Sequence, residues 1–179
     1  MKIFSYSLLI IIFQSCATVK SEDEFVKSDY EIAEKTLVCF DKWNNYRLIS
    51  EPDNYIVDNY LDGFMIDTLD LRNYKFDFKS NRDAKWEYKN FSNPSILAKL
   101  KIIDDYSKVK TVYLNDYKDA KRFIKMSRPL YSNDNKYAAV HISSFFNLLT
   151  SSQLEGYTLI FFRENNEWTL ISCVLTSIS

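Results

Sequence analysis

His141 is the only histidine in this chain, and its surroundings offer the one set of residue types that could form a nucleophilic hydrolase. An imidazole beside a serine hydroxyl and a carboxylate can take the proton from the hydroxyl and make it a nucleophile. His141 lies in a run of strand type, and a neighbouring strand could bring Ser127 opposite it, with Asp134 supplying the carboxylate. A histidine in such a run is more often a packed residue, so a small hydrolase using Ser127 and His141 is kept as an alternative.

Sites that require a metal or a cofactor find little support in the residue types. A single histidine excludes zinc and copper centres that need two. The chain has only two glycines, Gly63 and Gly156, which excludes most loops that cradle phosphate. It also lacks a calcium-binding loop and a nucleophile elbow. We expect no metal and no cofactor, and we favour a protein that is not an enzyme.

Two features could bind a ligand without catalysis. Arg128, between Ser127 and Pro129, could bind an anionic group through two parallel hydrogen bonds, although a surface arginine paired with a carboxylate is the simpler interpretation. An alternating aromatic stripe that includes Phe76 and Trp86 could stack on sugar rings. Such a one-sided stripe is also how an antiparallel sheet builds its core. We expect core residues here and keep a glycan-binding aromatic platform as the alternative.

The first sixteen residues carry the most specific signal. An apolar run from Ile3 to Phe13 follows one lysine and ends at Gln14-Ser15-Cys16. The run is shorter than the roughly 20 residues that span a bilayer, and it suits an export signal. The segment resembles the lipobox of bacterial lipoproteins, in which a signal peptidase cuts directly before a cysteine that is then acylated. Ser15 matches the family, whereas Phe13 and Gln14 depart from its usual residues.

The resemblance implies a signal peptide over residues 1–15, acyl chains on Cys16 and a lipid anchor in the bacterial cell envelope. More than one acyl chain gives a stable anchor. We favour the outer membrane, because no Asp directly follows Cys16. A secreted protein cut near Ala17 and an uncleaved anchor are the alternatives. The stretch from Met126 through Tyr137 to Trp168 is also similar to small uncharacterised bacterial envelope lipoproteins, a family without an activity to imply.

Cys39 and Cys173 remain once Cys16 carries lipid. Disulfides form beyond the inner membrane, so the two could pair and close a loop of more than 100 residues. Two buried free thiols acting as small apolar residues are the alternative that we favour. The sequence leaves both states open.

The charge balance limits the possible partners. The whole chain has 23 Lys and Arg against 24 Asp and Glu, and loss of Lys2 with the signal leaves 22 against 24, a net charge of −2. Such a balance implies neither a nucleic acid nor an anionic lipid surface as a partner. We expect contact with the membrane through the acyl chains and with an unidentified protein or glycan of the envelope.

The mature chain predicts one helix followed by strands. Ser28 to Glu31 has the form of a capping box, and apolar residues recur behind it at helical spacing, which predicts an amphipathic helix from Ser28 to about Asn44. Residues 16–27 comprise the cysteine that the resemblance implies is lipidated and a polar stretch from Ala17 to Lys27, which predicts a flexible tether. A second helix is predicted from Pro52 to Leu61.

Several segments alternate between apolar and polar residues as half-buried strands do. Tyr74 to Phe78 and Ala84 to Tyr88 predict a pair of strands with every aromatic residue on one face. Ile96 to Ile103 fits a short helix or a strand equally. The other predicted strands are Val109 to Leu114, Phe123 to Tyr131, Tyr137 to Phe146, Tyr157 to Arg163 and Trp168 to Ile178.

These elements predict a single α+β domain over residues 28–179. We expect the N-terminal amphipathic helix to pack on a curved, mainly antiparallel sheet that ends in a four-strand meander. Pro129 cannot donate to a strand ladder, so its strand is expected at an edge or with a bulge. The leading hypothesis for function is a non-catalytic binding or assembly module, tethered by lipid to an envelope membrane.

Overall fold

The computed structural model describes residues 21–40, 46–54, 71, 73–104, 122–145 and 153–178. The predicted signal segment and Cys16 lie outside the described residues. So do the predicted strand from Val109 to Leu114 and all but the first three residues of the helix predicted from Pro52 to Leu61.

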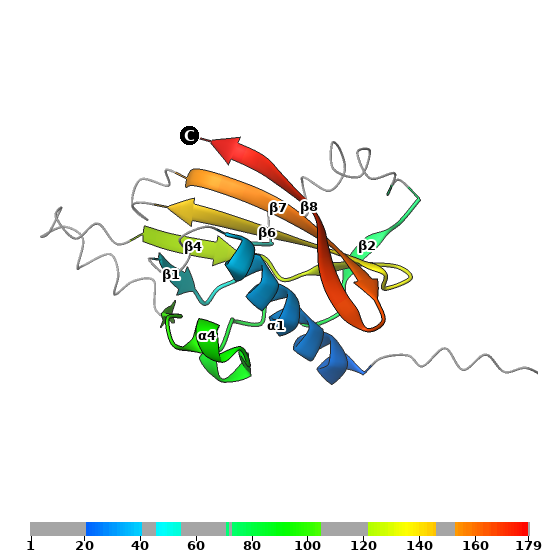
Figure 1. The fold of residues 1–179 in the computed structure, drawn as a ribbon, viewed down its shortest axis with the longest axis horizontal. Helices are drawn as coiled ribbons and strands as arrows, with labels where there is room; N and C mark the ends of the chain where they lie inside the picture. Colours follow the sequence, from blue (N-terminus) through cyan, green and yellow to red (C-terminus); the bar gives the residue numbers. More distant parts are fainter. Residues whose placement is uncertain are drawn as a thin grey trace, which may run out of the picture.

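The main layer of the fold is an eight-stranded sheet that curls into a half-barrel (Figure 1). Its strands follow the order β2-β5-β6-β4-β1-β3, and β7 pairs with β6 and with β8. Among the described strands, only β1 makes parallel pairs, with β3 and β4. The predicted α+β class with a mainly antiparallel sheet is therefore confirmed. The strands are β1 Tyr46–Ile49, β2 Phe76–Phe78, β3 Ile102–Ile103, β4 Arg122–Met126, β5 Leu130–Ser132, β6 Tyr137–Phe145, β7 Gln153–Glu164 and β8 Glu167–Ile178.

Strands β5 to β8 form the predicted antiparallel meander. The strand predicted from Phe123 to Tyr131 is divided at Ser127-Arg128-Pro129 into β4 and β5, which pair with successive parts of β6. Proline has no backbone N–H, so Pro129 cannot donate a hydrogen bond to a strand ladder. The ladder is interrupted at a residue that lacks this donor. Asn165 and Asn166, with φ of 50° and 66°, form the two-residue turn between β7 and β8.

The first helix, α1 (Glu22–Cys39), begins and ends earlier than predicted. Ser21 is its N-cap residue, and Glu22, Asp23 and Glu24 fill its first turn, where negative charges interact favourably with the helix dipole. Ser28 lies inside the helix and is buried, so the capping-box prediction was wrong. Residues 22–27, predicted as part of a tether, belong to α1.

The predicted pairing of the two aromatic strands was also wrong. β2 pairs with β5, and residues 84–87 lie outside any strand ladder before a 3₁₀ helix, Tyr88–Asn90. Phe76 packs in one apolar cluster and Trp86 in another, so the stripe does not share a face. The segment from Ile96 to Ile103 contains both of its alternatives, with a short helix α4 (Pro94–Leu97) before β3.

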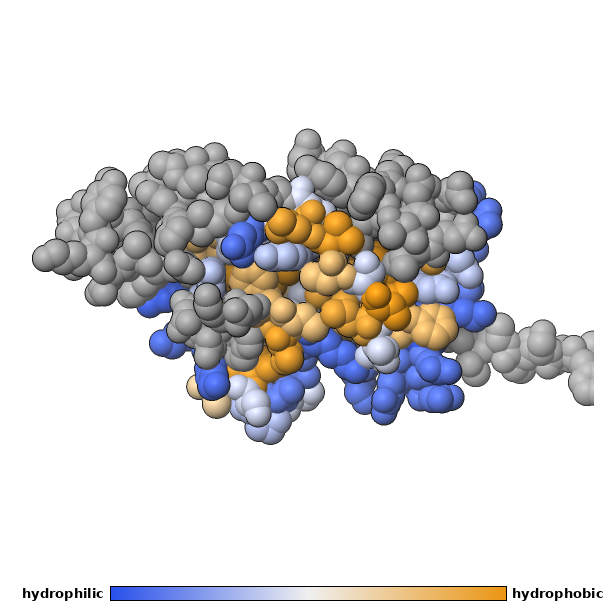
Figure 2. Space-filling model, turned by 45° about the horizontal axis from the view of Figure 1, so that its top comes forward, coloured by the Kyte–Doolittle hydropathy of each residue, from blue (hydrophilic) through white to orange (hydrophobic). Residues whose placement is uncertain are grey.

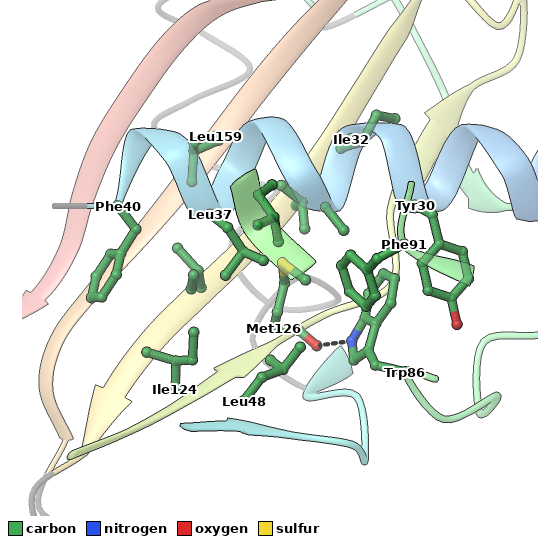
Figure 3. Close-up of a cluster of buried hydrophobic side chains, with 14 of the residues drawn as sticks. Tyr30, Ile32, Leu37, Phe40, Leu48, Trp86, Phe91, Ile124, Met126 and Leu159 are labelled. Carbon is green, nitrogen blue, oxygen red and sulfur yellow. Dashed lines mark hydrogen bonds between the residues drawn. The ribbon is translucent and has the colours of Figure 1, made fainter. Parts of the chain in front are cut away.

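The larger of the two main apolar clusters joins α1 to one face of the sheet. Figure 3 shows Leu37 of α1 directed toward this cluster, which also contains Ile32 of α1 and Met126 and Leu159 from the strands. Ala139 and Ile160 face the other way, into a second cluster that includes Leu71. The sheet therefore carries apolar side chains on both faces.

Candidate functional site

Ser127 and His141 lie beside each other, but Ser127 bonds to the backbone of His141 and not to its imidazole. The Ser127 N–H donates to the His141 carbonyl at 2.9 Å, and the Ser127 hydroxyl accepts from the His141 N–H at 2.9 Å. The imidazole Nδ1 lies 3.1 Å from the Thr158 hydroxyl. Asp134 lies in the turn before β6, where it accepts a hydrogen bond from Ser132, so it is far along the strand from His141. The three side chains do not converge as a triad.

The environment of His141 makes it a weak proton acceptor. The side chain is buried on β6, and burial lowers the pKa of the imidazole from 6.5 to about 4. Its Nε2 has no hydrogen-bond partner among the described residues. A general base needs contact with the substrate and a pKa near the working pH. His141, neutral and covered, has neither.

Arg128 lies inside the protein at the end of α1 that begins with Glu22. Its guanidinium donates to the carbonyl oxygens of Ala84 at 2.9 Å and Lys85 at 2.8 Å, and it pairs with the carboxylate of Asp29 at 3.4 Å. The same group lies 3.9 Å from the ring centre of Trp86. Arg128 thus ties β4 and β5 to α1 and to residues 84–86, and most of its donors are used within the protein.

Asp29 is the partner that sequence reasoning did not single out. It lies on the apolar side of α1, four residues after Phe25 and three before Ile32, and a carboxylate at that spacing is a signal that could have been noticed. Tyr131 donates to it at 2.7 Å, and the Ser80 hydroxyl donates to its other oxygen. Burial raises the pKa of the carboxyl from 3.8 to about 6, while Ser80, Tyr131 and Arg128 act to lower it.

The two aromatic candidates belong to the interior. Trp86 is fully buried, and its indole N–H donates to the Met126 carbonyl at 3.1 Å, as Figure 3 shows. Phe76 is half-buried and packs against the second apolar cluster. A sugar-stacking shelf requires exposed ring faces, and Trp86 provides none.

The most unusual surface in the described part of the chain is the outer edge of β8. Among the described strands, β8 pairs only with β7. From Trp168 to Ile178 it contains no charged residue, no proline and no glycine. Natural edge strands are usually protected by charge, proline, bulges or a short length. After Glu167, its first residue, β8 has bulges but lacks the other three protections.

Exposed apolar side chains concentrate around this edge. Four large apolar residues are exposed within the described ranges, and three of them are Val38 on α1 (61%) and Ile171 (42%) and Leu175 (43%) on β8. Figure 2 shows apolar side chains gathered on the face that β8 crosses. A groove of about 410 Å³ runs between α1 and β8, with Val38, Trp168 and Leu170 in its lining.

In the part of the chain that the structure describes, α1 bonds only to the start of this edge. Lys35 donates to the carbonyl of Trp168 at 2.5 Å, and the Trp168 N–H donates to Glu31 at 3.4 Å. These two contacts occupy the outward peptide groups of one residue. Two bulges, at Ile171 and Thr176, then leave Ser172 to Leu175 as a stretch of regular pairing with β7.

Cys39 and Cys173 are both free and exposed. They line one cavity of about 150 Å³ together with Phe40, Tyr157 and Leu159.

No protein-family model, curated protein or solved structure matches this chain. Function must therefore be argued from the geometry of its own residues. Within the described residues, no helix has the length and apolar character needed to cross a membrane. In the same residues, no three His, Cys, Asp or Glu side chains are grouped so that they could hold a metal ion.

Proposed function

We propose that this protein is a lipid-anchored envelope protein that binds an extended segment of another envelope protein along β8, without catalysing a reaction. The observation that carries the proposal is the edge strand β8, which has no charged residue in the eleven positions after Glu167, exposes Ile171 and Leu175, and lies beside exposed Val38. An added strand gains affinity from backbone hydrogen bonds and specificity from alternate side chains. Because β8 has no charge of its own between Trp168 and Ile178, the matching segment is expected to be uncharged and rich in apolar and small polar residues.

The groove between α1 and β8 also supports the proposal of an extended segment bound along β8. The regular stretch from Ser172 to Leu175 is short, so strand pairing alone offers few hydrogen bonds. Side chains on alternate positions of an added strand can enter the groove over Trp168 and Leu170. The buried positions of His141 and Trp86 give less support to the hydrolase and glycan-binding alternatives.

The anchor is part of the proposal. Acyl chains on Cys16 would hold the domain at the outer membrane, and only residues 17–21 separate that cysteine from the first residue of α1. A fully extended chain reaches at most about 3.6 Å per residue, so Glu22 would stay within about 22 Å of the acylated residue. We also propose that α1 stays docked on the sheet, because its apolar side would otherwise be exposed.

Site-specific photocrosslinking in intact cells tests the function. A crosslinking residue at Ile171 is expected to capture an extended segment of one partner, whereas the same residue at Tyr88, the fourth exposed large apolar position, is expected to capture little of it. Equal capture from both positions would contradict a specific edge. A product containing two copies of this chain would assign the edge to self-association instead.

A further inference from the structure

Cys39 and Cys173, the two cysteines outside the signal region, line the same cavity. Cys39 is the last residue of α1, and Cys173 pairs with Leu159 across β7 and β8. Directly paired residues of adjacent strands have side chains on the same face of a sheet. Leu159 belongs to the cluster beneath α1 (Figure 3), so Cys173 also lies on the helix side. Both side chains line the cavity of about 150 Å³.

The cavity suits a covalent link between these residues. Apart from Glu155, the other lining residues are Phe40, Ile142, Tyr157 and Leu159, which offer no competing thiol. Both cysteines are exposed, so a reagent in solution can reach them. Burial raises the pKa of both thiols, and the nearby Cys39 raises the pKa of Cys173 further.

We propose that Cys39 and Cys173 form a disulfide by exchange with a small-molecule or protein disulfide donor. One thiol loses its proton, attacks the donor disulfide and forms a mixed disulfide. The second thiolate then displaces the donor sulfur. Two S–H bonds are lost, one S–S bond forms within the chain, and the donor leaves as two thiols that carry the two protons.

The link would connect two elements that are far apart in the sequence. It would fix the last turn of α1 to the middle of β8, within the regular stretch from Ser172 to Leu175. Closure of the cavity requires the terminal turn of α1 to approach β8, and helix ends are the positions where such movement is easiest. This disulfide does not depend on the partner proposed for β8.

Peptide mapping of the oxidised full chain tests the link. The protein, purified in detergent without reductant, is incubated with oxidised glutathione, alkylated and digested with trypsin. The expected main product joins peptide 36–42 to peptide 164–179 through one disulfide, and reduction releases both. The oxidised protein is expected to unfold at a higher temperature than the reduced protein, and reductant should reverse the shift.

A displaced thiol provides the matched control. The double variant Cys39→Ser with Val38→Cys moves the thiol one position along α1, about 100° around the helix and out of the set that lines the cavity. It is expected to give glutathione adducts on separate peptides and at least tenfold less linked peptide. Separate adducts on Cys39 and Cys173 in the natural chain, or equal linkage in both proteins, would overturn the proposal.

Discussion

The phenol of Tyr131 donates a hydrogen bond of 2.7 Å to the carboxylate of Asp29, and both groups are buried. The bond joins β5 to α1 across 102 positions of sequence. Arg128, on the connection into β5, binds the same carboxylate and stacks on Trp86. The cluster fixes one end of the helix to the sheet, and it leaves the opposite end, near β8, as the region with exposed apolar groups.

Asp29 is expected to make the protein less stable as the pH rises. The folded carboxyl keeps its proton up to a pKa of about 6, whereas the ordinary value is 3.8. The protonated carboxyl therefore contributes about 3 kcal/mol to the free energy of unfolding below pH 3.8. This contribution is lost as the pH rises through 6. Urea unfolding of Asp29→Asn and the natural protein from pH 4 to 7 checks this. The advantage of the natural protein over the variant should shrink with rising pH, and a constant difference would contradict it.

His141 is expected to act in the opposite direction. Its pKa is about 4 in the folded protein against an ordinary 6.5. A depressed histidine pKa gives stability that is complete above pH 6.5 and is lost as the pH falls to about 4, again by about 3 kcal/mol. His141→Asn should remove this dependence, while Asp29→Asn leaves it. The natural protein should show a nearly flat profile between pH 4 and 6, because the two effects oppose each other.

Removal of one hydroxyl tests the Asp29 cluster without changing its charge. Tyr131→Phe leaves a buried carboxylate oxygen without its donor, which costs about 2 kcal/mol of unfolding free energy. The pKa of Asp29 should rise further, because the lost bond favours the ionised form. Tyr88→Phe is the matched control, since that hydroxyl bonds to the Leu97 carbonyl on an exposed side chain. A similar loss in both variants would speak against a special role for the Tyr131 hydroxyl.

Arg128→Lys tests whether the shape of the guanidinium matters beyond its charge. Lysine keeps the charge but cannot reach Ala84, Lys85 and Asp29 together or stack as a plane on Trp86. We expect a loss of about 3 kcal/mol in chemical denaturation. Arg82→Lys, with a side chain about half exposed, should change stability by less than about 0.5 kcal/mol. Equal stability of the Arg128 variant and the natural protein would contradict the account.

The lipid anchor is tested by Cys16→Ser. Metabolic labelling with a fatty-acid analogue should mark the natural protein and leave the variant unlabelled. The variant should also leave the membrane fraction if its signal is cleaved at another position. Label retained without Cys16 would exclude acylation at this residue.

The sequence predicted those parts of the fold that depend on local patterns. Alternation from Tyr137 onward predicted the meander correctly. Local patterns do not identify distant partners, so neither the parallel pairing of β1 with β4 nor the antiparallel pairing of β2 with β5 was predicted. The acidic residues after Ser21 suggested a tether, because a first helical turn and a solvated linker share that composition.

For the candidate sites too, the sequence predicted local features but not contacts between distant residues. An uncharged β8 could be read directly from Trp168 to Ile178, whereas its place at the edge required the strand order. Arg128 was noticed as a cation, but its carboxylate partner lies 99 positions away on the apolar side of a helix. A sequence pattern contains no information about that distance in space.

The most direct test of the central claim combines crosslinking at Ile171 with a charge placed at Leu175. Both side chains are exposed, so Leu175→Lys should leave the melting temperature nearly unchanged while adding the kind of charge that protects natural edges. Strand addition at β8 predicts at least a tenfold loss of the product captured from Ile171 in intact cells, and Tyr88→Lys should leave that product unchanged. Undiminished capture by a folded Leu175→Lys variant would contradict binding along β8.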